Sequence, residues 1–332
     1  MDVLLSIPLV STIFTPSWST SINILFFYAT WSTLVLTHDA AVIHATALFV
    51  LRIFLWLIPS LLFLAFDTLF PGLATSIKFA GAASLPRRPL RLLALAVFNM
   101  LLLTATEAGL TYAFHYATSK PLFRTSTTLP LPWQVFKHVL ILFSAREGLT
   151  YYTHRFLLHS NSRSPLTTLH LRYGHANPAC SLNLYGDHPL PLLVLSLVPV
   201  LLPSLILRPH LLTYILFTAL CTGEGTLATS GYSIVPGIFL GGIARRTAVH
   251  YASKGKANYG AWGFLDWVNG TSRGGDVLED VKDEAEKHHL KERSSKKVDE
   301  GAGLIQDGID ALTKNGTGTR RSTRKRTPRK TG

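Results

Sequence analysis

The chain has 332 residues, of which 48% are hydrophobic and only 15% are charged, and its mean hydropathy is +0.27. Soluble globular proteins carry about 25% charged residues, so this composition argues against a soluble domain and indicates a membrane protein. The net charge of +13 does not indicate nucleic-acid binding, because basic residues beside apolar segments usually mark the cytosolic face. Cys180 and Cys221 form no CxxC pair, which argues against a disulfide framework or a zinc knuckle.

Long apolar segments predict an all-α integral membrane protein with about six membrane helices. A span needs ~20 largely apolar residues, and the expected spans are residues 21–37, 53–72, 92–113, 134–150, 189–207 and 211–229. Arg52 falls at the mouth of the second span, where we expect its long side chain to reach the polar surface. The last two spans are joined by three residues, so they form a tight hairpin, with a re-entrant pair as the alternative.

Basic residues concentrate in three regions: the second-to-third loop, the fourth-to-fifth loop and the chain after the sixth span. They include Lys78, Arg87, Arg88, Arg91, Arg155, Arg163, Arg172, Arg245, Arg246, Lys254 and Lys256. Six spans place all three regions on one side, which the positive-inside rule assigns to the cytosol. Residues 273–332 are dense in both charges and predict a largely disordered cytosolic tail, within which residues 276–287 have the composition of a solvated helix.

Six histidines lie on this predicted cytosolic side, at span ends and in loops. They are His154, His159, His170, His175, His188 and His250. Imidazole suits Fe, Zn and Cu, so the group predicts a metal site. Two pairs are five residues apart, a spacing that turns the second side chain ~140° away on an ideal α-helix. Convergence therefore requires a helix break or an approach from the flanks. Structural roles stay open for the isolated His250 and for His188 as an interfacial cap.

Three carboxylates are candidate catalytic or ligating groups: Glu147, Asp187 and Glu224. Glu147 shares a helical face with His154, and an acidic group near a span end should be paired inside the protein. Glu224 lies within an apolar segment, where a carboxylate indicates a functional site. Asp187 is suited to orienting an imidazole. A salt bridge of Glu147 with a neighbouring arginine, and a neutral Glu224 bonded to threonines, are the structural alternatives.

Several segments, in order, resemble the fatty acid hydroxylase / sterol desaturase superfamily. The run E-G-L-T-Y-Y-T-H-R-F-L-L-H at 147–159 resembles its first histidine box, and Y-G-D-H-P-L-P at 185–191 resembles the segment after the second. Residues 230–233 and 241–246 resemble the approach to the third box. The closing motif is similar to N-Y-G at 258–260 followed by W-G-F-L-D-W and Gly270-Thr271. The resemblance covers roughly residues 134–272, which divides the chain into N-terminal membrane helices (1–133), this domain and the tail (273–332).

The resemblance implies a membrane protein of the endoplasmic reticulum with a non-haem di-metal centre on eight or more histidines. It further implies O₂-dependent hydroxylation or desaturation of a sterol, fatty acyl or sphingoid lipid, with electrons from NAD(P)H through cytochrome b5 or a reductase. Two boxes depart from the family pattern. Tyr173 and Gly174 stand where the second box usually ends in two histidines, and the third box keeps His250 alone. The remaining imidazoles suit one iron fully, or two sparsely with help from carboxylates.

A membrane-bound iron oxidoreductase acting on lipid is therefore the function that the sequence favours. The alternative is a catalytically inactive family member that binds lipid or regulates an active relative. A transporter ranks low because the chain has no repeated halves. The basic run at 320–326 favours anionic lipid headgroups over nucleic acid as a partner.

Overall fold

The computed structural model describes residues 18–86, 88–160, 164–235 and 237–274. Within these ranges the chain forms helices and two isolated β-bridges but no β-strand, which confirms the all-α class. The predicted tail lies outside the described residues from residue 275 onward, as does its expected helix at 276–287.

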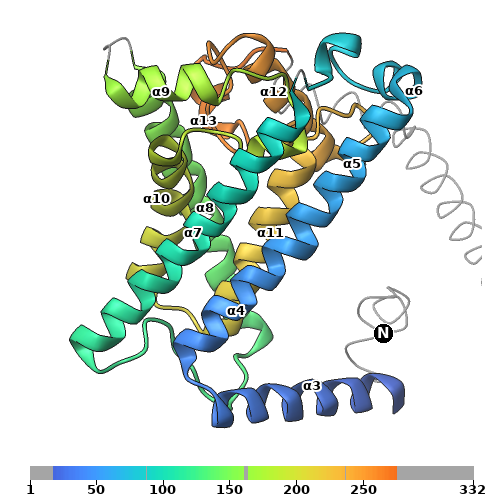
Figure 1. Ribbon diagram of the computed structural model, residues 1–332. Helices are drawn as coiled ribbons and strands as arrows, with labels where there is room; N and C mark the ends of the chain where they lie inside the picture. The colour runs from blue at the N-terminus through green and yellow to red at the C-terminus, as the bar shows by residue number, and fades with distance from the viewer. Residues whose placement is uncertain (1–17, 87, 161–163, 236, 275–332) are drawn as a thin grey trace, which may run out of the picture. The chain divides into compact units, whose positions relative to one another are not determined.

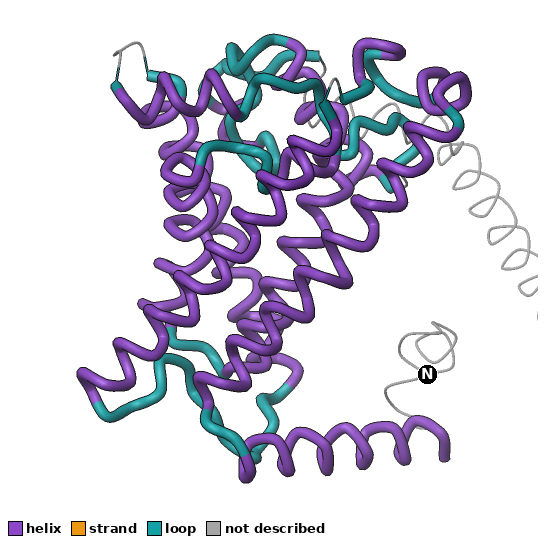
Figure 2. The backbone as a smooth tube through the Cα atoms, in the orientation of Figure 1, coloured by secondary structure: helices purple, strands orange, loops and turns teal. Residues whose placement is uncertain are grey.

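Fifteen α-, π- or 3₁₀-helical segments follow one another along the described chain, and Figures 1 and 2 show their arrangement. The α-helices are α3 (Trp18–Thr37), α4 (Ala40–Arg52), α5 (Ile58–Leu69), α6 (Pro71–Ser76), α7 (Pro89–Thr118), α8 (Pro132–Thr153), α9 (Pro165–Tyr173), α10 (Pro189–Leu207), α11 (Leu211–Thr229), α12 (Ile238–Ala252) and α13 (Phe264–Val268). Two π-helical turns, η1 (Ile53–Leu57) and η3 (His154–Leu158), and two 3₁₀ turns, η2 (Gly81–Ser84) and η4 (Ser181–Leu184), complete the set.

Four helices in the described chain are long and apolar enough to cross a membrane: the continuous helix Ala40–Leu69, α7, α10 and α11. The expected spans at 21–37 and 134–150 correspond to α3 and α8. Helix α3 runs across the end of the bundle in Figure 1 instead of along it. Helix α8 has 22 residues but carries Lys137 and Arg146. The count of six spans therefore stays a prediction.

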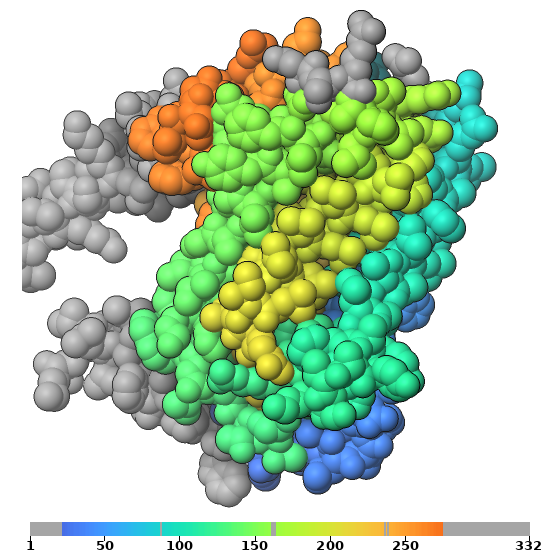
Figure 3. Space-filling view, turned by 90° about the vertical axis from the view of Figure 1, so that its left-hand side faces the viewer, coloured from blue at the N-terminus to red at the C-terminus, as the bar shows by residue number. Residues whose placement is uncertain are grey.

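Helices α10 and α11 form the expected hairpin through Arg208-Pro209-His210. Each has 19 residues and is therefore about 28 Å long, close to the ~30 Å hydrocarbon thickness of a bilayer. Figure 3 shows α10 between α7 and α8 on one face of the bundle. This length favours two full crossings over a re-entrant pair.

The short helices α6, α9, α12 and α13 lie together at one end of the bundle (Figure 1). The described basic residues of the three regions belong to or adjoin these helices, so they share that end. The connections of the opposite end are held together through backbone bonds, because Arg124 N–H donates to the Pro209 carbonyl and Leu211 N–H donates to the Arg124 carbonyl.

Arg52 is buried inside the bundle, with 2% of its surface exposed, instead of reaching the polar surface as expected. Its Nη2 donates to Glu107 Oε2 of α7 at 2.5 Å, and its Nη1 donates to Thr104 Oγ1 at 2.7 Å. The expectation was wrong because α4, η1 and α5 form one helix that starts at Ala40, which places Arg52 well inside the span.

Loss of one partner of this ion pair should destabilise the protein more than loss of both. Arg52→Met leaves the Glu107 carboxylate buried without its counter-charge, which costs about 3–5 kcal/mol of unfolding free energy. The double variant Arg52→Met/Glu107→Leu removes both charges and should recover most of that loss. Denaturant unfolding of the purified protein in mild detergent measures the difference. Equal destabilisation by the single and double variants would contradict a charge-pairing role.

Candidate metal centre

Five histidines gather at the end of the bundle that carries α9 and α12. The ligand nitrogens of His154, His159, His170 and His250 all lie within 4.8 Å of one another. His175 joins them, since its Nε2 lies 3.2 Å from His159 Nε2. We call these five residues the histidine cluster. Their ring centroids stand 4.6 Å apart for His154 and His250 and 5.0 Å apart for His170 and His175.

A π-helical turn brings His154 and His159 together despite their spacing of five residues. Helix α8 continues into η3, where the His159 N–H donates to the His154 carbonyl at 3.0 Å. A π-turn closes between residues five apart, so the side chains return to nearly the same face after five residues. The α-helical rotation of ~140° does not apply here, and the two ring centroids are 4.8 Å apart.

The end of helix α9 brings the second pair, His170 and His175, together. Helix α9 ends at Tyr173, and the following turn leads the chain back so that His175 faces the same point as His170. Gly174 packs against the imidazole of His170, because a Cβ at Gly174 would lie 3.0 Å from that ring. A larger residue at Gly174 would therefore press on His170.

Three imidazoles of the cluster are oriented by acceptors at Nδ1. His170 Nδ1 donates to Asp187 Oδ2 at 2.5 Å, His250 Nδ1 to the Ala257 carbonyl at 2.7 Å, and His154 Nδ1 to the Tyr259 carbonyl at 3.0 Å. A proton on Nδ1 leaves Nε2 with a free lone pair, which is the usual arrangement of metal-binding histidines. The hydrogen bonds therefore turn three Nε2 atoms toward the centre.

Two nitrogen–nitrogen separations around His159 match those of ligands that share one transition-metal ion. Two nitrogens bound to the same ion at about 2.1 Å stand about 3.0 Å apart at a right angle and about 3.4 Å apart in a tetrahedron. His159 Nε2 lies 3.2 Å from both His170 Nε2 and His175 Nε2. His154 Nε2 is buried and has no hydrogen-bond partner within the described structure. A buried imidazole nitrogen without a partner is costly unless it binds a ligand.

Burial favours the neutral form of three of these histidines. Loss of hydration lowers the pKa of His250 to about 4, and it lowers the pKa of His154 and His175 well below the ordinary value, with neighbouring histidines adding to the effect. Neutral imidazole is the form that binds metals.

The loop after α12 carries the carbonyls that orient His154 and His250, and Asp266 of α13 holds this loop in shape. Asp266 is fully buried and accepts hydrogen bonds from Tyr259 N–H at 2.8 Å and Gly260 N–H at 2.6 Å. Asn258 ties the loop to α12 by donating to the Arg246 carbonyl at 3.1 Å. The N-Y-G and W-G-F-L-D-W motifs thus build the scaffold of the cluster. Asp266 was not among the predicted site residues, although it stands within the second motif.

The three predicted carboxylates take separate positions. Asp187 contacts the cluster, because it accepts from His170 and from the backbone N–H of His188. Glu147 accepts from the Trp262 backbone N–H at 2.7 Å. Glu224 pairs with both Nη atoms of Arg146 and accepts from the Trp262 indole at 3.1 Å. No carboxylate joins the grouped ligand atoms of the described chain, so Glu147 and Glu224 anchor the closing loop instead.

His188 lies apart from the cluster. It caps α10, where its Nδ1 accepts from the Leu190 N–H at 3.3 Å, and its ring contacts Tyr173. This position differs from the predicted ligand role and matches the cap that the sequence left open, because Pro189 begins the helix directly after it.

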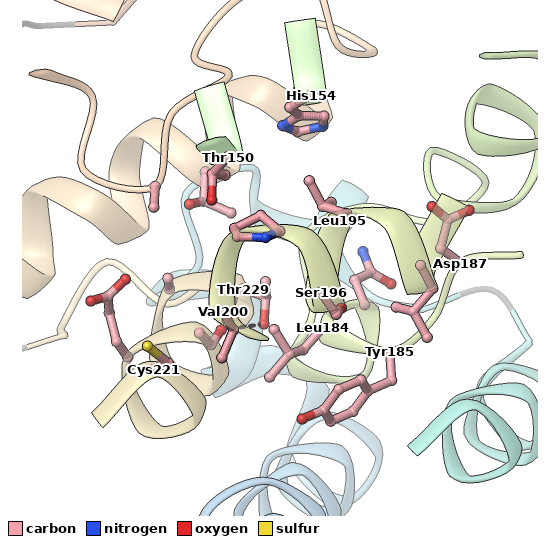
Figure 4. A pocket seen from close by; sticks show the side chains of 18 of the residues that line it. Thr150, His154, Leu184, Tyr185, Asp187, Leu195, Ser196, Val200, Cys221 and Thr229 are labelled. Atoms are coloured by element: carbon pink, nitrogen blue, oxygen red, sulfur yellow. Dashed lines mark hydrogen bonds between the residues drawn. The ribbon is translucent and has the colours of Figure 1, made fainter. Parts of the chain in front are cut away.

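A cavity of about 240 Å³ leads from the cluster into the helix bundle. His154, His170, His175 and His250 line its outer end, and residues of α4, α7, α8, α10, α11 and α12 line the remainder together with the segments 183–187 and 258–261. Figure 4 shows His154 and Tyr185 on opposite sides, with Leu195, Ser196 and Val200 of α10 between them. The cluster therefore faces a space that is largely walled by membrane helices.

Gly255 is expected to be essential for the position of His159. It has φ +75°, and a Cβ there would lie 1.9 Å from His159 Cε1. Gly255→Ala should displace the imidazole and lower Co²⁺ affinity at least tenfold, measured by visible absorption during titration of the purified protein. Gly270→Ala is the matched control, because Gly270 has φ +65° with no atom within 4 Å of an added Cβ. Equal effects of the two variants would contradict the contact with His159.

Asp187→Asn should weaken metal binding about 10–100-fold, the usual effect of removing a carboxylate that orients a ligating histidine. An amide oxygen can serve only one of the two N–H groups that Asp187 now accepts. The same Co²⁺ titration measures the effect, with His188→Ala as the control that should leave the affinity unchanged. An undiminished affinity in Asp187→Asn would argue that His170 needs no such support.

Comparison with known proteins agrees with this geometry. The family model described as fatty acid hydroxylase matches residues 139–271, a segment that contains all five residues of the histidine cluster, the π-turn and the closing loop. No solved structure significantly matches the chain. The family match confirms the resemblance: residues 139–271 form a fatty acid hydroxylase domain, which supports membership of the fatty acid hydroxylase / sterol desaturase superfamily.

Proposed function

We propose that the protein is a membrane-bound non-haem iron oxidoreductase that uses O₂ to hydroxylate or desaturate a lipid. The observation that carries this proposal is the convergence of five imidazoles at the outer end of a cavity between membrane helices. Imidazole-rich sites suit iron, and membrane helices admit a hydrocarbon chain from the bilayer. Membership of the fatty acid hydroxylase family supports the reaction class.

We propose one iron ion instead of the family's two. His154, His159, His170 and His250 would hold it, with His175 as a fifth donor. The positions that carry further histidines in the family hold Tyr173, Gly174 and the run 246–249 here. Arg246 packs against Gly263, since a Cβ at Gly263 would lie 2.5 Å from its Nε. Glu224 is paired with Arg146, Glu147 Oε2 accepts from the Trp262 backbone N–H, and neither carboxylate joins the grouped ligand atoms of the described chain.

An iron ion bound here would supply the activation of O₂. One oxygen atom of O₂ enters a C–H bond and the other leaves as water, which consumes two electrons and two protons; desaturation instead removes two hydrogens and yields two waters. The chain's own residues would do three things. The acceptors Asp187, Ala257 and Tyr259 hold the imidazoles at fixed angles. The apolar side chains of α10 exclude water and position the hydrocarbon. The pair Arg146–Glu224 fixes the closing loop over the cavity.

The electrons are proposed to come from NAD(P)H through cytochrome b5 or a reductase, which would dock at the end of the bundle that carries the cluster. Basic residues of α9, α12 and their loops gather at that end. This positive charge would favour the approach of an electron donor with an acidic face. The same bias supports an orientation in the endoplasmic reticulum membrane with this end in the cytosol.

The second and third histidine boxes lack several of the family's histidines, and this favours one alternative, a catalytically inactive member that binds lipid or regulates a relative. Such a protein would keep the fold and the cavity without holding iron in the cell. The two functions differ in metal content and in the effect of ligand substitutions.

Metal analysis and lipid profiling together test the proposal. The purified chain should contain about one iron per molecule, and His154→Ala and His170→Ala should each lose it. Cells deleted for the gene should accumulate a substrate lipid that the wild-type protein converts, whereas neither variant should do so. Two irons per chain would contradict the single site. Absence of transition metal together with full complementation by both variants would favour the inactive alternative.

A further inference from the structure

The inner end of the cavity carries a polar site that the metal chemistry does not use. Arg52 and Glu107 line the same cavity as the histidine cluster, together with Tyr185, Thr218 and Thr222. Arg52 stands twelve residues after Ala40, which is about 18 Å along a 30-residue membrane helix. Polar groups at this depth have no bulk water to bind, so each open donor or acceptor favours a ligand.

The Arg52–Glu107 pair has spare hydrogen-bonding capacity. Arg52 Nε is buried and has no partner in the described structure. Among the described residues, Glu107 Oε1 receives only the Tyr214 hydroxyl at 3.5 Å, the outer limit of a hydrogen bond. The cavity's other ion pair, Arg146–Glu224, differs in this respect. Both Nη atoms of Arg146 donate to Glu224, and the indole of Trp262 donates there as well. The inner pair is therefore the one with open positions.

Charge balance decides which ligand suits these positions. Arg52 is already neutralised by Glu107, so a carboxylate or phosphate here would add an uncompensated charge inside the membrane, which is costly. A hydroxyl adds no charge, and it can accept from a guanidinium while donating to a carboxylate. Between this polar end and the cluster the wall is mainly apolar, with Leu103, Leu192, Leu195, Pro199 and Val200.

We propose that the Arg52–Glu107 pair is a recognition site for the hydroxyl group of a neutral lipid alcohol, whose hydrocarbon body extends along α10 toward the histidine cluster. The lipid enters with its hydroxyl innermost, and the cluster faces the opposite end of the molecule. The pair thus selects alcohols over fatty acids and over hydroxyl-capped derivatives. That this lipid is the substrate rests on the function proposed above, whereas its binding does not.

Equilibrium binding to the purified full chain in detergent tests the site. The probes are tritiated hexadecanol and tritiated cholesterol, each competed by its own unlabelled form, by its methyl ether and, for the linear chain, by hexadecanoate. A methyl ether accepts a hydrogen bond but cannot donate to Glu107. The alcohol should therefore bind about tenfold more tightly than its ether, as expected for one hydrogen bond to a charged group. If hexadecanol shows this preference, the site takes a linear alcohol; if cholesterol shows it, the site takes a sterol.

The double variant Arg52→Met/Glu107→Leu should reduce the alcohol-to-ether ratio to about one while ether binding persists. Its matched control is Lys78→Met/Asp67→Leu, which removes another buried ion pair that does not line the cavity. The control should keep the wild-type preference. Equal binding of alcohol and ether by the wild type, or an unchanged preference in the double variant, overturns the proposal.

His170→Ala separates this site from the proposed reaction. The variant removes a proposed iron ligand but leaves the inner end of the cavity unaltered, so the tenfold preference for the alcohol should persist without bound metal. A wild-type protein that lacks iron but prefers the alcohol would refute the oxidoreductase and support the binding site. A wild-type protein that holds iron and converts lipid, but binds the alcohol no better than its ether, would support the oxidoreductase and refute the binding site.

Discussion

Three buried ion pairs determine how the helices of this protein pack, because a charge inside an apolar bundle needs a counter-charge against it. Arg52–Glu107 joins α4 to α7, and Arg146–Glu224 joins α8 to α11. Lys78–Asp67 connects the end of α5 to the loop beyond α6, where the Tyr232 hydroxyl also donates to Asp67 at 2.6 Å. Apolar contacts between membrane helices are nearly as favourable with lipid as with protein, so these polar contacts specify which faces meet.

The histidine cluster depends on this packing through its supports. Asn99 of α7 donates to the carbonyls of Tyr185 and Asp187, which holds the segment that orients His170. The closing loop is anchored to α8 by Glu147 and to α11 by Glu224. A shift of either helix would therefore be transmitted to the carbonyls that orient His154 and His250. The cluster lies at the end of the bundle, yet its geometry is set by contacts that reach into the membrane helices.

One cavity connects the cluster with the inner polar pair, and this arrangement gives the two sites complementary tasks. The outer end offers imidazole nitrogen ligands, and the inner end offers an ion pair with open hydrogen-bonding positions. A lipid held at one end by its hydroxyl has its distance to the other end set by the length of its hydrocarbon body. In this arrangement the position of oxidation would depend on molecular length, which is a physical basis for selectivity in a cavity whose walls are largely apolar.

The amino-acid sequence alone determined the all-α membrane class, the α10–α11 hairpin, the family and the segments that carry the site, because apolar length, loop charge and motif order are local properties. It placed all five residues of the histidine cluster among its six candidates, together with Asp187. Only the tertiary structure separated His188 from the others, since the sequence does not distinguish a helix-capping histidine from a metal-binding one. The convergence of His154 and His159 needed a π-turn, which α-helical periodicity does not anticipate. The burial of Arg52 likewise followed from contacts with α7 that lie 55 residues away along the chain. Pairing between distant helices decides where a charged or ligating side chain points, and that pairing is a property of the packed bundle.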